Sequence, residues 1–324
     1  MRIGILGAGD MGAMHARLFS AIPGVEIAAV VGRYPDRVAK LGAELDVEAL
    51  TDPRAIIDDD TVDAVDITYP SALHRELAVA ALERDKHVLC ETPMALNVDD
   101  ANAMISAARA RNRILMPAQV HRFGVEASFI HEQVAAGTMG EPVAAYASSR
   151  SAPYGAGNRR PVDLYGGPML DLMIHPFDTL NWLLGQPLTV SGAGQIGPSG
   201  TYDYAFVTLD FGDASGLAEG SAMMPQSFPF TISLRVLCAD GALEARLRLG
   251  PEEDFGLVRY PKTGDPELLT LEGGDPYARE LENFVDCVRE GSGPTVASAE
   301  GEREAIRIAL AAEQAIEQGT TVTL

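Results

Sequence analysis

Arg2-Ile-Gly-Ile-Leu-Gly-Ala-Gly-Asp-Met-Gly12, near the start of the chain, predicts a nucleotide-binding fold. The residues before the glycines form a short apolar run with the length of a buried strand, and those after them predict a helix. Gly7 permits a tight turn, Gly9 lets the backbone approach a pyrophosphate, and Gly12 allows close helix–strand packing. The N-terminus of the helix offers free N–H groups to phosphates. The alternative is a purely structural glycine turn.

Composition narrows the class of protein. A length of 324 residues fits two domains. The formal net charge of −21 argues against nucleic acid and anionic membranes as partners. No apolar run is long enough to span a membrane, and no secretory signal is present. Cys90, Cys238 and Cys287 show neither a metal-binding nor a disulfide pattern. We therefore expect a cytoplasmic protein with no metal site.

The second apolar run, residues 27–31, ends in Gly32-Arg33-Tyr34. A site selective for NAD usually has an acidic residue there, which accepts a hydrogen bond from the ribose 2′-hydroxyl. Here no acid is present, and Arg33, with Arg37 one helical turn later, suits a 2′-phosphate. NADP is therefore the preferred expectation, NAD remains open, and the alternative is that both arginines are solvated surface charges.

Strands and helices alternate through residues 1–120, which predicts a parallel sheet with helices on both faces, a Rossmann dinucleotide-binding domain. Ligands of such sheets bind beyond the carboxyl ends of the strands. We expect this edge of the sheet to bring together three segments. They are the glycine turn, residues 68–74 after the fourth predicted strand, and residues 91–93 after the fifth predicted strand.

Residues 121–324 predict a different architecture. Strand-like runs recur from 143 to 260 with few helices between them, so we expect an α+β domain with an open, mainly antiparallel sheet. Within it, Asp171 and His175 lie four residues apart and would share one face of a helix. A histidine titrates near neutrality and can transfer a proton in either direction. Asp178 is more often structural at such a position, and Pro176 is expected to kink the helix. The alternative for Asp171 and His175 is a helix-packing aspartate and a satisfied core histidine.

Five segments together resemble the Gfo/Idh/MocA oxidoreductase family, and they follow the chain in order. They are Gly7-Ala-Gly-Asp-Met-Gly12 with His15, Thr68-Tyr-Pro-Ser-Ala-Leu-His74, Lys86-His-Val-Leu-Cys-Glu-Thr-Pro93, His121-Arg-Phe123, and residues 166–178.

The resemblance implies roles for residues of both domains. His175 would be the general acid/base and Asp171 a hydrogen-bonding partner of the substrate. The free face of the second sheet would pack against a partner subunit in a homodimer or homotetramer. The residues expected at the cofactor are Gly7, Gly9, Asp10, Met11, Gly12, Arg33, Arg37, Thr68, Tyr69, Pro70, His74, Glu91, Pro93 and Gln119.

One departure concerns Glu91-Thr92-Pro93, where the family usually has Glu-Lys-Pro. The family's lysine reaches the reacting hydroxyl of the substrate, whereas Thr92 can hydrogen-bond but carries no charge. The three lysines, Lys40, Lys86 and Lys262, stand elsewhere in the sequence. An arginine such as Arg122, Arg159 or Arg160 could supply positive charge but is a poor proton donor.

We therefore expect an NAD(P)-dependent oxidoreductase that transfers a hydride between the nicotinamide and a carbinol carbon of a sugar, polyol or related small molecule. His175, Asp171 and Thr92 would act on the reacting hydroxyl. Two alternatives stay open. One is an enzyme that retains its nucleotide and cleaves glycosidic bonds through a transient oxidation, and the other is a non-catalytic nucleotide-binding regulator.

Overall fold

The computed structural model describes residues 1–153, 161–249 and 254–324. The chain divides into two compact units. The first unit is Met1–Phe123 with Gly274–Arg303, and the second is Gly124–Gly273 with Glu304–Leu324. The first unit thus includes a return of the chain that the expected boundary at residue 120 assigns to the second domain.

The first unit is built around a six-stranded parallel sheet in the order β3-β2-β1-β4-β5-β6, which is the Rossmann order. Its elements are β1 (Arg2–Leu6), α1 (Asp10–Ala21), β2 (Glu26–Val31), α2 (Pro35–Leu45), β3 (Glu48–Leu50), α3 (Arg54–Ile57), β4 (Ala64–Ile67), the 3₁₀ turn η1 (Ser71–Leu73), α4 (His74–Glu83), β5 (His87–Glu91), α5 (Val98–Arg111), β6 (Leu115–Ala118), the 3₁₀ turn η2 (Val120–Phe123) and α10 (Pro276–Glu290).

Helix α10 completes the hydrophobic core of the first unit. The Phe284 ring packs edge-on against Phe19 of α1, with ring centroids 6.4 Å apart, and both side chains are fully buried. The side chain of Asp275 caps the helix by accepting a hydrogen bond from Tyr277 N–H at 3.0 Å. The core of this domain therefore needs residues from both ends of the chain.

The second unit contains a nine-stranded sheet in the order β14-β13-β12-β11-β7-β10-β9-β8-β15. Apart from the parallel pair β7–β10, its neighbouring strands are antiparallel, which confirms the expected fold class. Its elements are α6 (Val125–Ala135), β7 (Pro142–Arg150), α7 (Val162–Tyr165), α8 (Gly167–Asp171), α9 (Ile174–Leu184), β8 (Thr189–Ile196), β9 (Tyr202–Asp210), β10 (Ser215–Ser221), β11 (Phe230–Cys238), β12 (Gly241–Leu249), β13 (Asp254–Pro261), β14 (Glu267–Leu269) and β15 (Val322–Thr323), with α11 (Ala299–Gln318) entering from the first unit.

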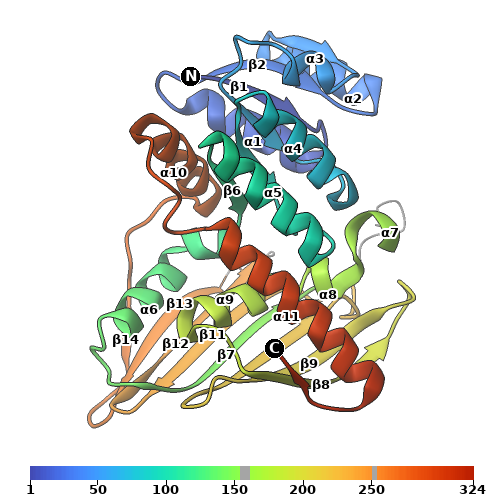
Figure 1. Ribbon diagram of the computed structural model, residues 1–324. Helices are drawn as coiled ribbons and strands as arrows, with labels where there is room; N and C mark the ends of the chain where they lie inside the picture. The colour runs from blue at the N-terminus through green and yellow to red at the C-terminus, as the bar shows by residue number, and fades with distance from the viewer. Residues whose placement is uncertain (154–160, 250–253) are drawn as a thin grey trace. The chain divides into compact units, whose positions relative to one another are not determined.

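Helices lie over one face of this sheet (Figure 1). Glycines on the strands make room for them. A Cβ at Gly220 of β10 would stand 2.1 Å from Met173 Cγ, and one at Gly192 of β8 would stand 3.3 Å from Ile316 of α11. The approach at Gly220 places the α8–α9 segment, which carries Asp171 and His175, against the sheet, and the approach at Gly192 does the same for α11.

No helix in the described part of the chain is both long and apolar enough to cross a bilayer.

Candidate active site

The glycine turn joins β1 to α1, and its three glycines have three different surroundings. Gly7 has a φ of +135°, a conformation that favours glycine, and a Cβ there would collide with Thr68. A Cβ on Gly12 would stand 1.9 Å from the Gly7 carbonyl oxygen, so only glycine lets the helix approach the turn this closely. A Cβ on Gly9 would meet nothing within 4 Å. The turn therefore has no room for a side chain at Gly7 or Gly12, whereas the space next to Gly9 is open.

This open side fits a pyrophosphate. Gly9 is the N-cap of the 12-residue helix α1, and no side chain caps that end. The first N–H groups and the positive end of the helix dipole are therefore left to a ligand. Asp10 and Met11 form the first turn of α1 beside Gly12, so they offer backbone groups at the same place.

The two arginines expected at the ribose follow β2, with Arg33 in the connection after the strand and Arg37 in the first turn of α2. Leu6 of β1 pairs with Val31 of β2, so the end of β2 lies beside the glycine turn. Arg33 and Arg37 are both exposed. Their guanidinium carbons lie 5.9 and 5.5 Å from the centre of the Tyr34 ring, which is 61% exposed. The two cations therefore share one aromatic side chain at the surface, the type of contact that orients a guanidinium.

The segment after β4 contributes Thr68, Tyr69 and Pro70 to the same edge. Thr68 Oγ1 donates to the Leu6 carbonyl at 3.3 Å, which ties the segment to the glycine turn. The Tyr69 hydroxyl is buried and has no hydrogen-bond partner among the described residues. Burial raises the pKa of Tyr69, and the charge of Arg33 lowers it, so Tyr69 lies within the field of Arg33. An orphaned hydroxyl at this place is a suitable partner for a ribose or phosphate oxygen.

His74 and Gln119 are turned into the interior, which differs from the direct cofactor contact expected for them. His74 is 1% exposed, and its Nε2 and Nδ1 lie 2.6 and 3.0 Å from the carbonyl oxygens of Tyr69 and Pro93. The Gln119 amide, 1% exposed, donates to the Glu302 carboxylate. The structure gives both residues a supporting place behind the edge.

Glu91, Thr92 and Pro93 form the turn after β5. Thr92 is partly exposed, and its backbone N–H donates to the Glu91 carboxylate at 3.1 Å. Lys86 is 2% exposed and donates to the carbonyls of Asp59 and Val62, so it is not available in place of the family's lysine.

Of the three arginines considered as substitutes, only Arg122 lies among the described residues, and it is not available either. Arg122 is 5% exposed and donates to the Val296 carbonyl at 2.7 Å. Arg159 and Arg160 lie outside the described residues.

In the second unit, Asp171 and His175 do not share one continuous helix, which corrects the expectation. Helix α8 ends at Asp171, Leu172 and Met173 form a turn, and α9 begins at Ile174. Pro176 explains the break, because it has no N–H to donate to Leu172 as a continuous helix would require. Pro176 lies in the first turn of α9, where the backbone N–H groups have no acceptor within the helix. The missing N–H therefore costs no hydrogen bond there, and Pro176 does not kink α9.

His175 is partly buried, and its protonation is set by its surroundings. Burial lowers its pKa to about 4, while the negative charge of Asp178 acts in the opposite direction. Asp178 itself is fully buried. The imidazole is therefore neutral near pH 7 and able to accept a proton. A general base that removes the hydroxyl proton during oxidation of an alcohol must be in this state.

The comparisons with known proteins agree with this geometry. Residues 1–119 match the model of the oxidoreductase family with an NAD-binding Rossmann fold, and residues 128–244 match the GFO/IDH/MocA C-terminal domain. The chain is 30% identical to myo-inositol 2-dehydrogenase of Thermotoga maritima, over 100% of this chain and 98% of that protein.

Two further relatives extend this similarity. The chain is 30% identical to D-xylose 1-dehydrogenase (NADP(+)) 2 of Haloferax volcanii, over 91% of each chain. Among solved structures, a probable dehydrogenase from Thermotoga maritima has a TM-score of 0.85 and 27% identity, over 100% of this chain and 98% of that one. The chain therefore belongs to the Gfo/Idh/MocA family of NAD(P)-dependent oxidoreductases.

Proposed function

We propose that this enzyme oxidises a secondary hydroxyl group of a sugar or polyol with NADP as its preferred cofactor. When bound, the nicotinamide supplies the acceptor for the hydride. His175 takes the proton of the hydroxyl, Asp171 hydrogen-bonds the substrate, and Thr92 holds the reacting oxygen. The observation that carries the proposal is the glycine turn, which is open to a dinucleotide at Gly9, in a chain that also has a partly buried histidine, His175, beside the charge of Asp178.

The cofactor preference rests on the end of β2. No acidic residue is present at positions 32–34, directly after β2, whereas Arg33 and Arg37 stand exposed around Tyr34. A guanidinium can bind two oxygens of a 2′-phosphate, and the missing acid removes the usual partner of the NAD ribose. A local positive charge is also needed because the chain as a whole carries −21.

Calorimetric titration with NADPH and with NADH tests the cofactor. Tighter binding of NADPH supports the role of Arg33, and equal or tighter binding of NADH discards it while leaving the dehydrogenase intact. Binding of neither nucleotide contradicts the proposed function. Fluorescence of Trp182 is less suitable, because its ring stacks on His131 at 3.9 Å and would also respond to changes there.

The substrate class is tested with a panel of inositols, aldoses and linear polyols. The panel includes the compounds that appear in the names of the relatives. Each is incubated with NADP⁺ and absorbance of the reduced nicotinamide is followed. Stoichiometric reduction supports the dehydrogenase. Product without any net change in absorbance would favour transient oxidation instead.

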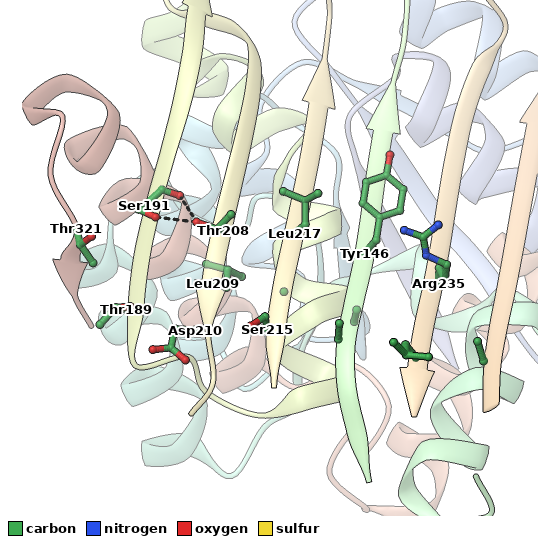
Figure 2. A pocket seen from close by; sticks show the side chains of 15 residues that line it. Tyr146, Thr189, Ser191, Thr208, Leu209, Asp210, Ser215, Leu217, Arg235 and Thr321 are labelled. Carbon is green, nitrogen blue, oxygen red and sulfur yellow. Dashed lines mark hydrogen bonds between the residues drawn. The ribbon is translucent and has the colours of Figure 1, made fainter. Parts of the chain in front are cut away.

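We also propose that a second copy of this chain packs on the face of the nine-stranded sheet that Figure 2 shows. A shallow cavity of about 680 Å³ lies there, lined by apolar and polar side chains such as Leu217, Tyr146 and Arg235. The side chains of Phe206 and Leu237 lie on this same face of the sheet and are 44% and 46% exposed. Exposed apolar groups on a sheet face are typical of an association surface. Light scattering on a size-exclusion column measures the oligomeric state, and a monomer at micromolar concentration would contradict this arrangement.

We place the enzyme in the cytoplasm, because its three cysteines are all free and buried in a chain without disulfides among the described residues. Fractionation of the source cells checks this location.

A further inference from the structure

In the turn after β5, the backbone groups of three consecutive residues contact the side chains of other residues. Thr92 N–H donates to Glu91 Oε2 at 3.1 Å, the Pro93 carbonyl lies 3.0 Å from His74 Nδ1, and Met94 N–H donates to Glu302 Oε1 at 3.2 Å. His74 and Glu302 are nearly or fully inaccessible to solvent. The backbone around Thr92 therefore has little freedom to move.

Glu91 is in turn held from behind by His15 of α1. His15 Nε2 lies 3.4 Å from Glu91 Oε1, and His15 Nδ1 lies 3.1 Å from Asp66 Oδ2 of β4. His15 and Asp66 are fully buried. The Nδ1–Asp66 contact is a hydrogen bond, whereas the Nε2–Glu91 contact is an ion pair without hydrogen-bond geometry, so a carboxylate lies next to each nitrogen of the ring. Burial opposes a positive charge on the ring, but Asp66 and Glu91 outweigh it and raise the pKa of His15 to about 9.

Helix α10 closes the cluster on the remaining side. The Tyr277 ring centre lies 6.4 Å from that of His15. Glu280 is fully buried, and neither of its carboxyl oxygens has a hydrogen-bond partner among the described residues. Burial and the charge of Glu91 raise the pKa of Glu280 well above its usual range. Among the described residues, Asp66 and Glu91 are the carboxylates in contact with His15, and His15 supplies the positive charge beside them.

We propose that His15, acting through Glu91, is a positioning residue that fixes Thr92 for the reaction. This inference rests on the proposed function, in which Thr92 stands at the lysine position of the family. A threonine hydroxyl has a short reach and no charge, so it contributes only when its backbone is held in place. The charge of the imidazolium attracts one oxygen of the Glu91 carboxylate, while the other oxygen accepts from Thr92 N–H. When His15 loses its proton, this attraction is lost and the hold on Thr92 weakens.

His15→Gln tests the proposal, with His87→Gln as a matched control. His87 belongs to the same domain and starts the strand that Glu91 ends, but its Nδ1 accepts from Ile114 N–H at the opposite edge of the sheet. We expect His15→Gln to lower kcat about tenfold or more, as for a misplaced catalytic group, with the Kd for NADPH within about threefold of the wild type. His87→Gln should leave kcat close to that of the wild type.

A second readout does not need activity. The pKa of His15 is about 9 when folded against 6.5 when unfolded, so the stabilisation from its charge is complete below pH 6.5 and is lost as the pH rises through 9. The Tm of the wild type should therefore fall more between pH 7 and 10 than that of His15→Gln. Glu91→Gln retains an acceptor for Thr92 N–H but removes the charge, so it should move the alkaline fall in Tm and in kcat to lower pH.

Two results would overturn the inference. One is an equal loss of kcat in His15→Gln and His87→Gln, and the other is an alkaline fall in Tm that His15→Gln and Glu91→Gln leave unchanged. If His15→Gln does not fold, Glu91→Gln alone tests the inference, through the pH at which Tm and kcat fall on the alkaline side. If the wild type binds neither nucleotide, the proposed function has failed, and the Tm profiles still show whether His15 is charged.

Discussion

The glycine turn of the first unit and the α8–α9 segment of the second differ in how their shape is set. In the glycine turn, each position is decided by atoms within a few residues or on the neighbouring strand. The Gly7 carbonyl excludes a side chain at Gly12, and Thr68 excludes one at Gly7. In α8–α9, a proline breaks one helix into two, and the protonation of His175 depends on burial and on Asp178. A local motif therefore specifies the glycine turn, whereas in α8–α9 the sequence specifies the break at Pro176 and packing sets the pKa of His175.

His175→Asn should have the largest effect and acts on the second region. Removing a general base typically lowers turnover about 10²–10⁴-fold. Calorimetry should show a cofactor affinity within about threefold of the wild type, since cofactor binding is assigned to the first unit. His131→Asn, which changes a histidine of α6 that stacks on Trp182, is the control and should keep most of the turnover. Retained turnover in His175→Asn would remove His175 from the mechanism.

A pair of glycine variants separates fold from binding within the first region. Gly12→Ala places a methyl group 1.9 Å from the Gly7 carbonyl oxygen, so we expect a loss of about 1–3 kcal/mol in the free energy of unfolding. Gly9→Ala meets no neighbour, and Gly9 has an ordinary φ of −79°, so its stability should change by less than about 0.5 kcal/mol.

The same pair should behave differently toward the cofactor. The methyl group of Gly9→Ala occupies the open side of the turn, and we expect a clear loss of NADPH affinity by calorimetry with Tm unchanged. If Gly9→Ala binds NADPH as tightly as the wild type, the phosphates do not approach Gly9.

Arg33→Ala tests whether the exposed end of β2 selects the cofactor. A hydrogen bond to a charged group contributes about 1.5–3 kcal/mol, so NADPH affinity should fall roughly 10- to 100-fold and NADH affinity should remain within about threefold. Arg17→Ala is the matched control, because Arg17 is also exposed and pairs with Glu44 at 2.5 Å on the surface. Equal losses for both nucleotides would show that Arg33 does not contact the 2′-phosphate.

The pH dependence of kcat/KM sharpens the view of His175. Because its pKa is lowered from 6.5 to about 4, the neutral, active base persists as the pH falls from 8 to 5, and oxidation should decline only near pH 4. Asp178→Asn removes the charge that raises this pKa, so its acid limb should move lower still. A half-maximal rate near pH 6.5 in the wild type would mean that the imidazole is not desolvated during turnover.

The Rossmann order and the mainly antiparallel second sheet could be predicted because strand and helix periodicities are local. The side-chain roles of His15, His74 and Gln119 could not. His15 is a helical residue in the sequence, but the fold surrounds it with Asp66 and Glu91, which are 51 and 76 positions away in the chain. The buried and unpaired Glu280 adds to this cluster only because α10 returns to the first unit.

The sequence by itself determined the dinucleotide-binding fold and the family, since these follow from residue type and short spacing. Only the tertiary structure decided that burial lowers the pKa of His175 and that His15 stands between two carboxylates. The physical reason is that protonation and side-chain orientation depend on burial and on charges brought together from distant parts of the chain.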